Sequence, residues 1–308
     1  MLSLRKSNLK PGWVAIAPLG DSARVAHVVC AEGERPALRW VCEAPWGDPT
    51  QALRTLRRSK RLQQLRTVAV LQRAQYQLLA MDAPDVPREE WRDAVRWHLK
   101  EMVDFAVDTA GIEVLEVPTG PTPRRTPSLI TIAAPHSALA PLADAGADAG
   151  LPWHAIDIEE TALRNIAALA EVPGRGQALL HVGEVHSTLV VTWQGELLLT
   201  RRIDVSLAQL TDTDESVRQL GFERASLELQ RTLDSAERQF SHVSLASVLV
   251  APGAALAAFI AYASDLVYVP IAAFDLAHLI DLTAVPELQD LRKQAAYLPA
   301  IGAALRSQ

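Results

Sequence analysis

The stretch ALLHVGEVHSTLVVTWQGELLLTRRI, residues 178–203, decides the fold class of this chain of 308 residues. Three short apolar runs lie within it, and the Gln194-Gly195 pair between the last two is typical of a hairpin turn. The chain opens in the same style with WVAIAPLGDSARVAHVV, residues 13–29, where a Gly-bearing turn separates two apolar runs. Two blocks that begin alike predict a duplicated α/β architecture with a cleft between its halves.

The segments around the two hairpins alternate between strand and helix patterns. Short apolar runs bounded by turn residues predict strands, at 39–42, 67–71, 76–81, 112–117, 129–133, 154–158, 248–250 and 267–269. Longer runs with helical spacing predict helices, at 137–149, 161–170, 224–240, 254–263 and 287–306, the last containing Pro299. The order strand, helix, strand over 129–158 is interpreted as a β-α-β unit.

A further helix is predicted after Val86-Pro87, because proline is favoured in the first helical turn and two glutamates follow it. Its apolar positions recur at the spacing of one helix face, at Trp91, Ala94, Val95, His98, Leu99 and Met102. We expect this face to be buried. His98 would then be a core residue and not a metal or catalytic ligand.

The composition is that of an ordinary globular protein, with 49% hydrophobic and 21% charged residues in a length typical of about two domains. The net charge of −6 argues against a general nucleic-acid binder.

The N-terminal residues lack the apolar core of a secretory signal. The uncharged segment 243–264 is interrupted by Pro252-Gly253, so we interpret it as strand, turn and helix and not as a membrane span.

The two cysteines, Cys30 and Cys42, lie in neighbouring strand-like runs. No CxxC motif accompanies them, so buried free thiols in a reducing compartment are the simpler interpretation, with a disulfide as the alternative.

One predicted helix carries a cluster of cations, Arg54, Arg57, Arg58, Lys60 and Arg61. Such a cluster could touch anionic lipid headgroups or RNA. A solvated helix face is the simpler interpretation, because the rest of the chain is acidic.

Several segments resemble the actin-like proteins of type IV pilus assembly, the PilM and MshI class. The most specific is the helix-and-turn over 92–108, which resembles the inserted subdomain of these proteins. The segments 130–135 and 155–165 resemble the closing strand of that subdomain and the return to the core. Residues 297–306 resemble the closing helix of the family, so the resemblance covers nearly the whole chain in the right order.

This resemblance implies an α/β, actin-like (ribonuclease H-like) duplicated fold with an inserted α+β subdomain. Residues 1–172 would form the first half, with 84–153 as the inserted subdomain, and residues 173–308 would form the second half. The C-terminal helix 287–306 would pack back toward the first half.

In actin-like ATPases the hairpin turns approach nucleotide phosphates, because backbone N–H groups reach phosphate oxygens where no Cβ intervenes. The resemblance places a vestigial nucleotide cleft at Gly20, Ser22, Gly183, Ser187, Thr188 and Gly253. The acidic residues of the family appear here as Ala17 and His181, and neutral imidazole is a poor ligand for Mg²⁺. We therefore expect no cofactor and a pseudo-ATPase, not an enzyme. Retained binding of ATP and Mg²⁺, with Asp21 and Glu184 as substitutes, is the alternative.

No catalytic residue and no metal site is predicted elsewhere. Asp157, Glu159 and Glu160 form the densest carboxylate cluster and would suit acid–base hydrolysis, but a strand end that leads into a helix N-terminus explains them more simply. His181 and His186 lack Cys or acidic companions at zinc spacing. The chain contains no GxSxG, P-loop or HExxH motif.

The resemblance implies a cytoplasmic scaffold or adaptor of type IV (MSHA-like) pilus biogenesis at the inner-membrane face. Its partner would be the cytoplasmic tail of an inner-membrane PilN-type protein, held between residues 92–108 and the strand near 76–81. A pilus assembly ATPase would be a further neighbour, and neither nucleic acid nor membrane insertion is expected. Three alternatives stay open: a nucleotide-binding switch of the same machinery, a GspL-like cytoplasmic domain of type II secretion, and a small-molecule kinase of the same superfamily.

Overall fold

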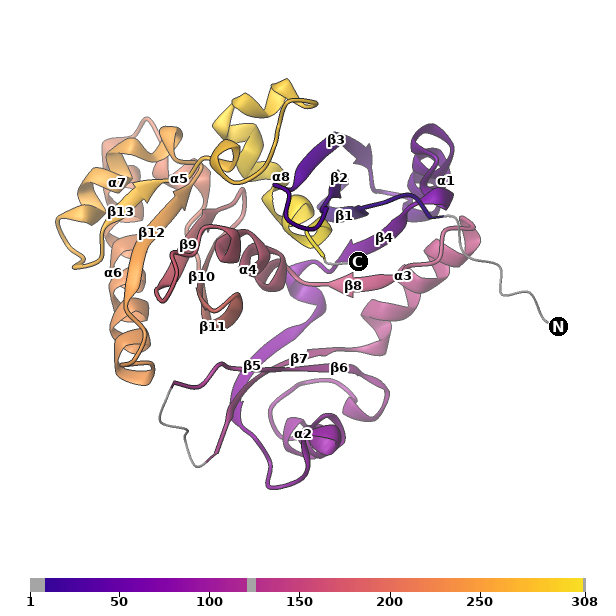
Figure 1. The fold of residues 1–308 in the computed structure, drawn as a ribbon, viewed down its shortest axis with the longest axis horizontal. Coiled ribbons are helices and arrows are strands. Elements are labelled where there is room, and N and C mark those ends of the chain that lie inside the picture. The colour runs from indigo at the N-terminus through magenta and orange to yellow at the C-terminus, as the bar shows by residue number, and fades with distance from the viewer. Residues whose placement is uncertain (1–8, 121–125, 307–308) are drawn as a thin grey trace.

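A computed structural model describes residues 9–120 and 126–306 of the chain. Five strands of the first half form one sheet in the order β3-β2-β1-β4-β8 (Figure 1). Their bounds are β1 Trp13–Leu19, β2 Ser22–Val29, β3 Ala37–Pro45, β4 Arg66–Val70 and β8 Ala155–Asp157. β1, β2 and β3 are antiparallel neighbours, whereas β4 is parallel to both β1 and β8.

The second half repeats this sheet strand for strand, in the order β11-β10-β9-β12-β13. Its strands are β9 Gly176–Val182, β10 Ser187–Trp193, β11 Glu196–Ile203, β12 Leu245–Ala251 and β13 Ile271–Ala273. β9, β10 and β11 are antiparallel neighbours, and β12 runs parallel to β9 and β13. The predicted duplication is therefore present at the level of strand order and direction.

A third sheet has the order β5-β7-β6 and lies at the bottom of Figure 1. Its strands are β5 Gln77–Asp82, β6 Gly111–Glu116 and β7 Ser128–Ala134. The helix α2, Trp91–Leu99, covers this sheet through its buried residues Val95 and Leu99. This sheet begins at Gln77, seven residues before the predicted start of the inserted subdomain at 84.

The prediction of a β-α-β unit over 129–158 is wrong. β7 belongs to the third sheet and β8 to the first, so the helix α3, His136–Asp148, connects two different sheets. The sequence pattern gave the type of each element correctly, but it contains no information on which strands pair.

Two helices of the first half, α1 and α3, pack on one face of its sheet. Leu53 and Leu56 of α1, Pro49–Lys60, share an apolar cluster with Val14 and Ile16 of β1, and α3 joins it through Ala145. The remaining helices are α4 Glu159–Leu169, α5 Leu207–Leu210, α6 Glu215–Gln239, α7 Ala257–Ser264 and α8 Leu291–Ala304. Short 3-10 turns lie at Leu62–Gln64, Arg73–Gln75, Arg88–Glu90, Val107–Thr109, Ala254–Leu256, Leu276–His278 and Pro286–Gln289.

The helices α4 and α8 join the two halves (Figure 1). Buried residues of both helices, among them Ile166 and Ile301, lie in one apolar cluster with buried residues of the first and second sheets. The two helix backbones approach closely at Gly302, where an added Cβ would lie 2.1 Å from the carbonyl oxygen of Ala162. Asn165 also donates a hydrogen bond from Nδ2 to the carbonyl oxygen of Gly302, at 2.9 Å.

Two local predictions are wrong. The strand expected at 267–269 lies instead at Ile271–Ala273, beside β12. On the helix after Pro87, His98 and Met102 are exposed and only Val95 and Leu99 are buried, because α2 ends at Leu99 and presents a narrow face to its sheet. None of the helices in the described residues is long and apolar enough to cross a membrane.

The two cysteines are free thiols, as the sequence predicted, but both are half-buried and not fully buried. Cys42 packs against the cluster that contains α1, whereas Cys30 packs against the cluster shared by both halves, so the two side chains serve different apolar regions. Burial raises the pKa of both thiols.

Candidate functional site in the cleft between the halves

A cavity of about 380 Å³ lies between the two halves. Its walls are the β1–β2 turn from Ala17 to Gly20, the β9–β10 turn from Val182 to His186, the N-terminal residue of α4, and one side of α8. Both hairpin turns of the duplicated fold therefore face the same space, as the repeated sequence pattern predicted.

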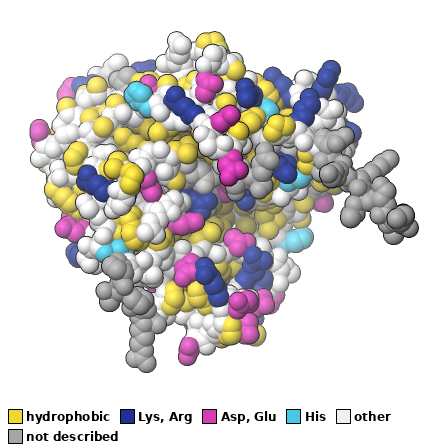
Figure 2. Space-filling view, in the orientation of Figure 1, with side chains coloured by type: hydrophobic (Ala, Val, Ile, Leu, Met, Phe, Trp, Pro, Cys, Tyr) yellow, Lys and Arg dark blue, Asp and Glu magenta, His cyan; other side chains and the backbone are white. Residues whose placement is uncertain are grey.

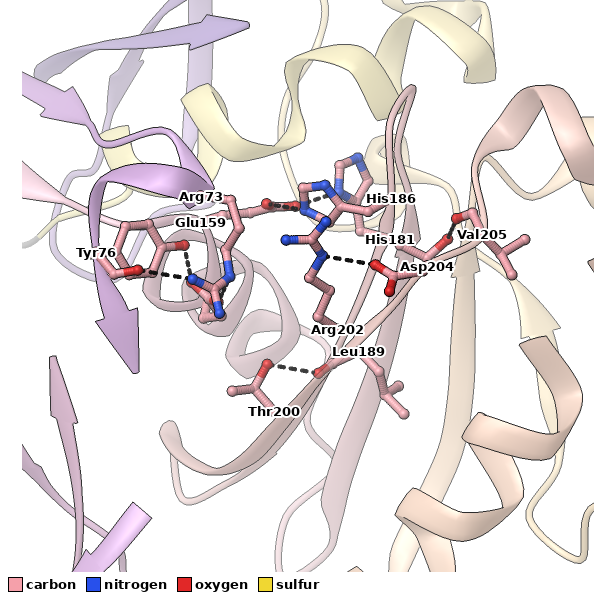
Figure 3. A network of polar contacts seen from close by, with 12 residues as sticks. Arg73, Tyr76, Glu159, His181, His186, Leu189, Thr200, Arg202, Asp204 and Val205 are labelled. Carbon is pink, nitrogen blue, oxygen red and sulfur yellow. Dashed lines mark hydrogen bonds and ion pairs between the residues drawn. The ribbon is translucent and has the colours of Figure 1, made fainter. Parts of the chain in front are cut away.

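The carboxylate of Glu159, at the N-terminus of α4, lies between two histidines of the second half (Figure 3). Oε1 lies 3.1 Å from Nδ1 of His181, and Oε2 lies 3.0 Å from Nε2 of His186. The second ring nitrogen of His181, Nε2, lies 2.9 Å from the carbonyl oxygen of Ala295 on α8. One buried polar cluster thus connects α4, β9, the turn after β9, and α8.

The same geometry limits the hydrogen bonds that the cluster can make. A carboxylate and a backbone carbonyl both accept hydrogen bonds, and a neutral imidazole carries only one N–H. His181 faces one acceptor at each nitrogen, so a neutral ring can donate to only one of the two. Burial raises the pKa of Glu159, but the hydrogen bonds from His181 and His186 outweigh it and hold the pKa well below its usual range. The cluster is therefore a buried carboxylate held by two imidazole rings.

Acid should weaken this cluster. A carboxylate whose pKa is lower in the folded than in the unfolded state stabilises the fold above its ordinary value, 4.5 for Glu159, and that stability is lost as pH falls below it. We expect the free energy of unfolding to decrease as the pH falls below 4.5. In Glu159→Gln this decrease should be smaller than in the unmodified chain, by about 1.4 kcal/mol per pH unit. Urea unfolding at a series of acidic pH values measures both slopes, and parallel slopes would contradict the assignment.

The neighbouring carboxylates have other partners. Tyr76 donates a hydrogen bond to Oε2 of Glu160, and Arg73 lies 3.8 Å from Oε1 of the same carboxylate. Burial, together with the charge of Glu159, raises the pKa of Glu160 although the Tyr76 hydrogen bond lowers it. Asp157 pairs with Arg306 at 2.7 Å. The three carboxylates of the cluster predicted from sequence each hold a different part of the chain, an arrangement that supports a structural role.

The structure brings together two of the six residues predicted for a nucleotide cleft. Gly20, at φ +58°, and Gly183 both line the cavity. Ser187 and Thr188 are buried, and Ser187 donates its hydroxyl proton to the carbonyl oxygen of Val205 at 2.6 Å. Ser22 is not among the lining residues and accepts a hydrogen bond from Arg24.

Gly253, the predicted adenosine-side residue, faces the neighbouring strand and not the cavity. An added Cβ would lie 2.6 Å from the Cβ of Ala273 and 2.9 Å from the backbone nitrogen of Phe274. The glycine therefore permits close packing of the loop after β12 on the end of β13.

The residues present do not fit Mg²⁺. Ala17 offers no ligand atom, and both nitrogens of His181 face hydrogen-bond acceptors. Glu184 lines the cavity but lies 3.7 Å from Arg24, and Asp21 is exposed outside it. Among the described residues, no group of three His, Cys, Asp or Glu side chains is arranged to hold a metal ion.

The role of Glu159 was not predicted. No acidic companion of His181 and His186 stands at zinc spacing in the sequence, because Glu159 lies 22 residues before His181 and reaches it only through the packing of α4 on the second sheet. The ion pair between Arg24 of β2 and Glu184 of the β9–β10 turn also joins the two halves and was not predicted. The position of Glu159 at a helix N-terminus was the only local signal.

The repeated sheets, the cleft between them and the two linking helices define the actin-like ATPase fold of the α/β class, and the predicted fold is confirmed. The solved structure of the PilM-PilN type IV pilus biogenesis complex is similar to this chain over 96% of its residues and 98% of that chain. Its TM-score is 0.74 at 19% sequence identity. This likeness establishes that the chain has the fold of PilM.

Two other solved structures are more distant. A Bacteroides thetaiotaomicron protein with an actin-like ATPase fold is 9% identical, with 94% of this chain and 99% of that chain covered and a TM-score of 0.49. The cytoplasmic domain of EpsL, an inner membrane component of the type II secretion system of Vibrio cholerae, is 12% identical, with 67% and 76% covered and a TM-score of 0.44. No family model and no curated protein sequence matches the chain.

Proposed function

We propose that this chain is a protein-binding scaffold of type IV pilus biogenesis that holds the cytoplasmic tail of an inner-membrane PilN-type protein. The observation that carries the proposal is the likeness to PilM in the PilM-PilN complex, which extends through both halves and the third sheet. The resemblance of residues 92–108 to MshI-type proteins favours an MSHA-like system. On this proposal the chain works at the cytoplasmic face of the inner membrane, with a pilus assembly ATPase as a neighbour.

A hollow of about 470 Å³ lies where the tail was predicted to bind. Its lining includes residues 76–79, at the start of β5, and Asp104 and Phe105, which follow α2. β5 is the outer strand of the third sheet, so one of its edges has no strand partner among the described residues. An extended peptide binds such an edge through main-chain hydrogen bonds.

The lining of the hollow suits an amphipathic tail. Leu78, Leu79 and Phe105 are half-buried apolar residues that offer contact area. The charged lining residues are Arg73 and Arg202, which also contact Glu160 and Asp204, and Asp104, which accepts a hydrogen bond from Gln77 at 3.0 Å. A tail with alternating apolar and charged residues would match these positions.

A bulky side chain in this hollow should block the tail. Ala74 is exposed and lines the hollow, so Ala74→Trp should fill it without disturbing the core. We expect at least a tenfold loss of affinity for the tail, on the scale of about 1.4 kcal/mol for each factor of ten. Fluorescence anisotropy with a labelled peptide of the PilN-type tail measures the change.

Ala147→Trp is the matched control, because Ala147 is exposed on α3, outside the lining of the hollow. Its affinity should equal that of the unmodified chain. Equal affinity of all three proteins would place the tail elsewhere, and absence of tail binding by the unmodified chain would refute the proposed function.

We expect the cleft to be a structural junction without ATPase activity. This expectation is supported by Ala17, whose side chain has no metal-ligand atom, and by the hydrogen-bond contact between His181 and Glu159, which occupies both side chains. Gly20 and Gly183 still line the cavity, and this observation favours a nucleotide-binding switch as the second candidate. Titration with ATP and Mg²⁺ distinguishes the two candidates, because a switch binds ATP in an Mg²⁺-dependent manner and a structural junction does not bind it.

A further inference from the structure

The helix α1 and the turn after it carry an unusual concentration of positive charge. Residues 49–81 contain seven Arg and Lys and no Asp or Glu, which gives this segment a charge of +7. Because the whole chain has a net charge of −6, the rest of the chain carries −13. Six of these cations lie on α1 or just after it. Lys10 lies beside them, because its backbone N–H donates a hydrogen bond to the carbonyl oxygen of Gln64 at 2.7 Å. We call these seven cations the basic face: Lys10, Arg54, Arg57, Arg58, Lys60, Arg61 and Arg66.

The basic face is exposed and keeps its charge unneutralised. Arg54, Arg57, Arg58 and Arg61 are exposed, and Figure 2 shows Lys and Arg side chains gathered at its upper right, where Figure 1 places α1. Within residues 9–120 and 126–306, none of the seven cations forms an ion pair. The exposed carboxylates Asp144 and Asp148 on the adjacent α3 are not paired with them either.

Some of these side chains are held in place by uncharged groups. Arg54 donates to the carbonyl oxygen of Asp148 at 3.2 Å and Arg57 to that of Ala149 at 3.3 Å, at the negative end of the α3 dipole. Lys60 lies 4.8 Å from the ring centroid of Trp40. These contacts fix the cations without cancelling their charge.

Arg61 is an independent sign that the charge itself matters. It ends α1 at φ +53°, a left-handed conformation that glycine adopts at lower cost than any residue with a Cβ. Among residues 9–120 and 126–306, its guanidinium has no hydrogen-bond or ion-pair partner that would account for an arginine at this position.

We propose that the basic face docks on anionic lipid headgroups and orients the protein on a membrane surface. A sequence pI of about 5.8 and a charge of −13 outside the face disfavour an extended nucleic acid, which would run along acidic surface as well. A lipid surface touches only the face itself, which is built around α1, a helix of 12 residues and about 18 Å long. The docking goes beyond tail binding and does not depend on it, although a second contact would strengthen attachment to a membrane-anchored partner.

The test is co-sedimentation of the full chain with phosphatidylcholine vesicles, with and without phosphatidylglycerol. We expect binding to the anionic vesicles alone, with affinity reduced by salt. The double variant Arg58→Gln, Arg61→Gly removes two unpaired charges and places glycine in the left-handed position, so its fold should persist. Since each cation near an anionic surface contributes roughly a factor of five, the variant should bind about 25-fold more weakly.

The matched control is Arg224→Gln, Arg238→Gln, which removes two exposed cations from α6 and should bind like the unmodified chain. Three results would overturn the proposal: no preference for anionic vesicles, equal loss of binding in both double variants, or binding of duplex DNA that depends on the basic face while anionic vesicles are ignored. Tail-peptide affinity measured on the same variants should be unchanged, so failure of lipid docking is distinguishable from failure of the proposed function.

Discussion

Replacing Gly302 by alanine is expected to lower the free energy of unfolding by about 3 kcal/mol or more, at the upper end of what overpacking costs. The new Cβ would lie 2.1 Å from the carbonyl oxygen of Ala162 and 2.6 Å from its carbonyl carbon. Both are backbone atoms of α4, so no side-chain rotation relieves the clash, and α8 must move away from α4. Because these two helices join the halves, the shift also disturbs the core that both halves share. Urea denaturation measures the change.

Gly47→Ala is the matched control. No heavy atom lies within 4 Å of a Cβ at that position. The free energy of unfolding of Gly47→Ala should therefore differ from that of the unmodified chain by no more than about 0.5 kcal/mol, as is usual for a surface substitution. An unchanged midpoint for Gly302→Ala would show that α4 and α8 are not in the close contact described above.

Replacing Glu159 by glutamine is expected to cost about 3 kcal/mol, because a buried histidine donor that bonded the carboxylate is left without an acceptor. The carboxylate side chain is 14% exposed and its partner His181 is 7% exposed, so water replaces little of the lost interaction. Glutamine has the same shape, but its amide group can accept only one of the two histidine hydrogen bonds. Denaturation at neutral pH measures the loss.

Glu160→Gln is the matched control one residue away on the same helix end. Its pKa is raised in the fold, so the folded state disfavours the charged carboxylate, and a neutral amide can still accept the hydrogen bond from Tyr76. We expect a change of no more than about 1 kcal/mol. Equal losses in the two variants would mean that the helix end, and not the histidine pair, sets the stability.

Much of the fold was predictable because each half begins with a hairpin whose turn residues are clear in the sequence. The Gly20 and Gln194-Gly195 turns, with the apolar runs beside them, fixed four strands of the two main sheets. Strand partnership was not predictable, because β7 and β8 were each predictable as short strands but nothing in the sequence shows that they belong to different sheets. The face of α2 was also misjudged, because periodicity does not show how wide a face the neighbouring sheet covers.

The candidate site was only partly predictable. The two hairpin turns converge on one cavity as the duplication required, and Gly20 and Gly183 line it. The contact of Glu159 with two histidines was not predictable, because it depends on how α4 packs between the halves. The same packing places Ala295 against His181, a contact across 114 residues that no sequence spacing indicates.

The most direct test of the central claim is calorimetric titration of the purified chain with the PilN-type tail peptide, with and without ATP and Mg²⁺. We expect one binding site, an affinity that does not change when ATP and Mg²⁺ are added, and no heat from the nucleotide alone. Tail binding that appears or strengthens only with ATP and Mg²⁺ would show a nucleotide-gated switch. No tail binding under either condition would contradict the scaffold proposal.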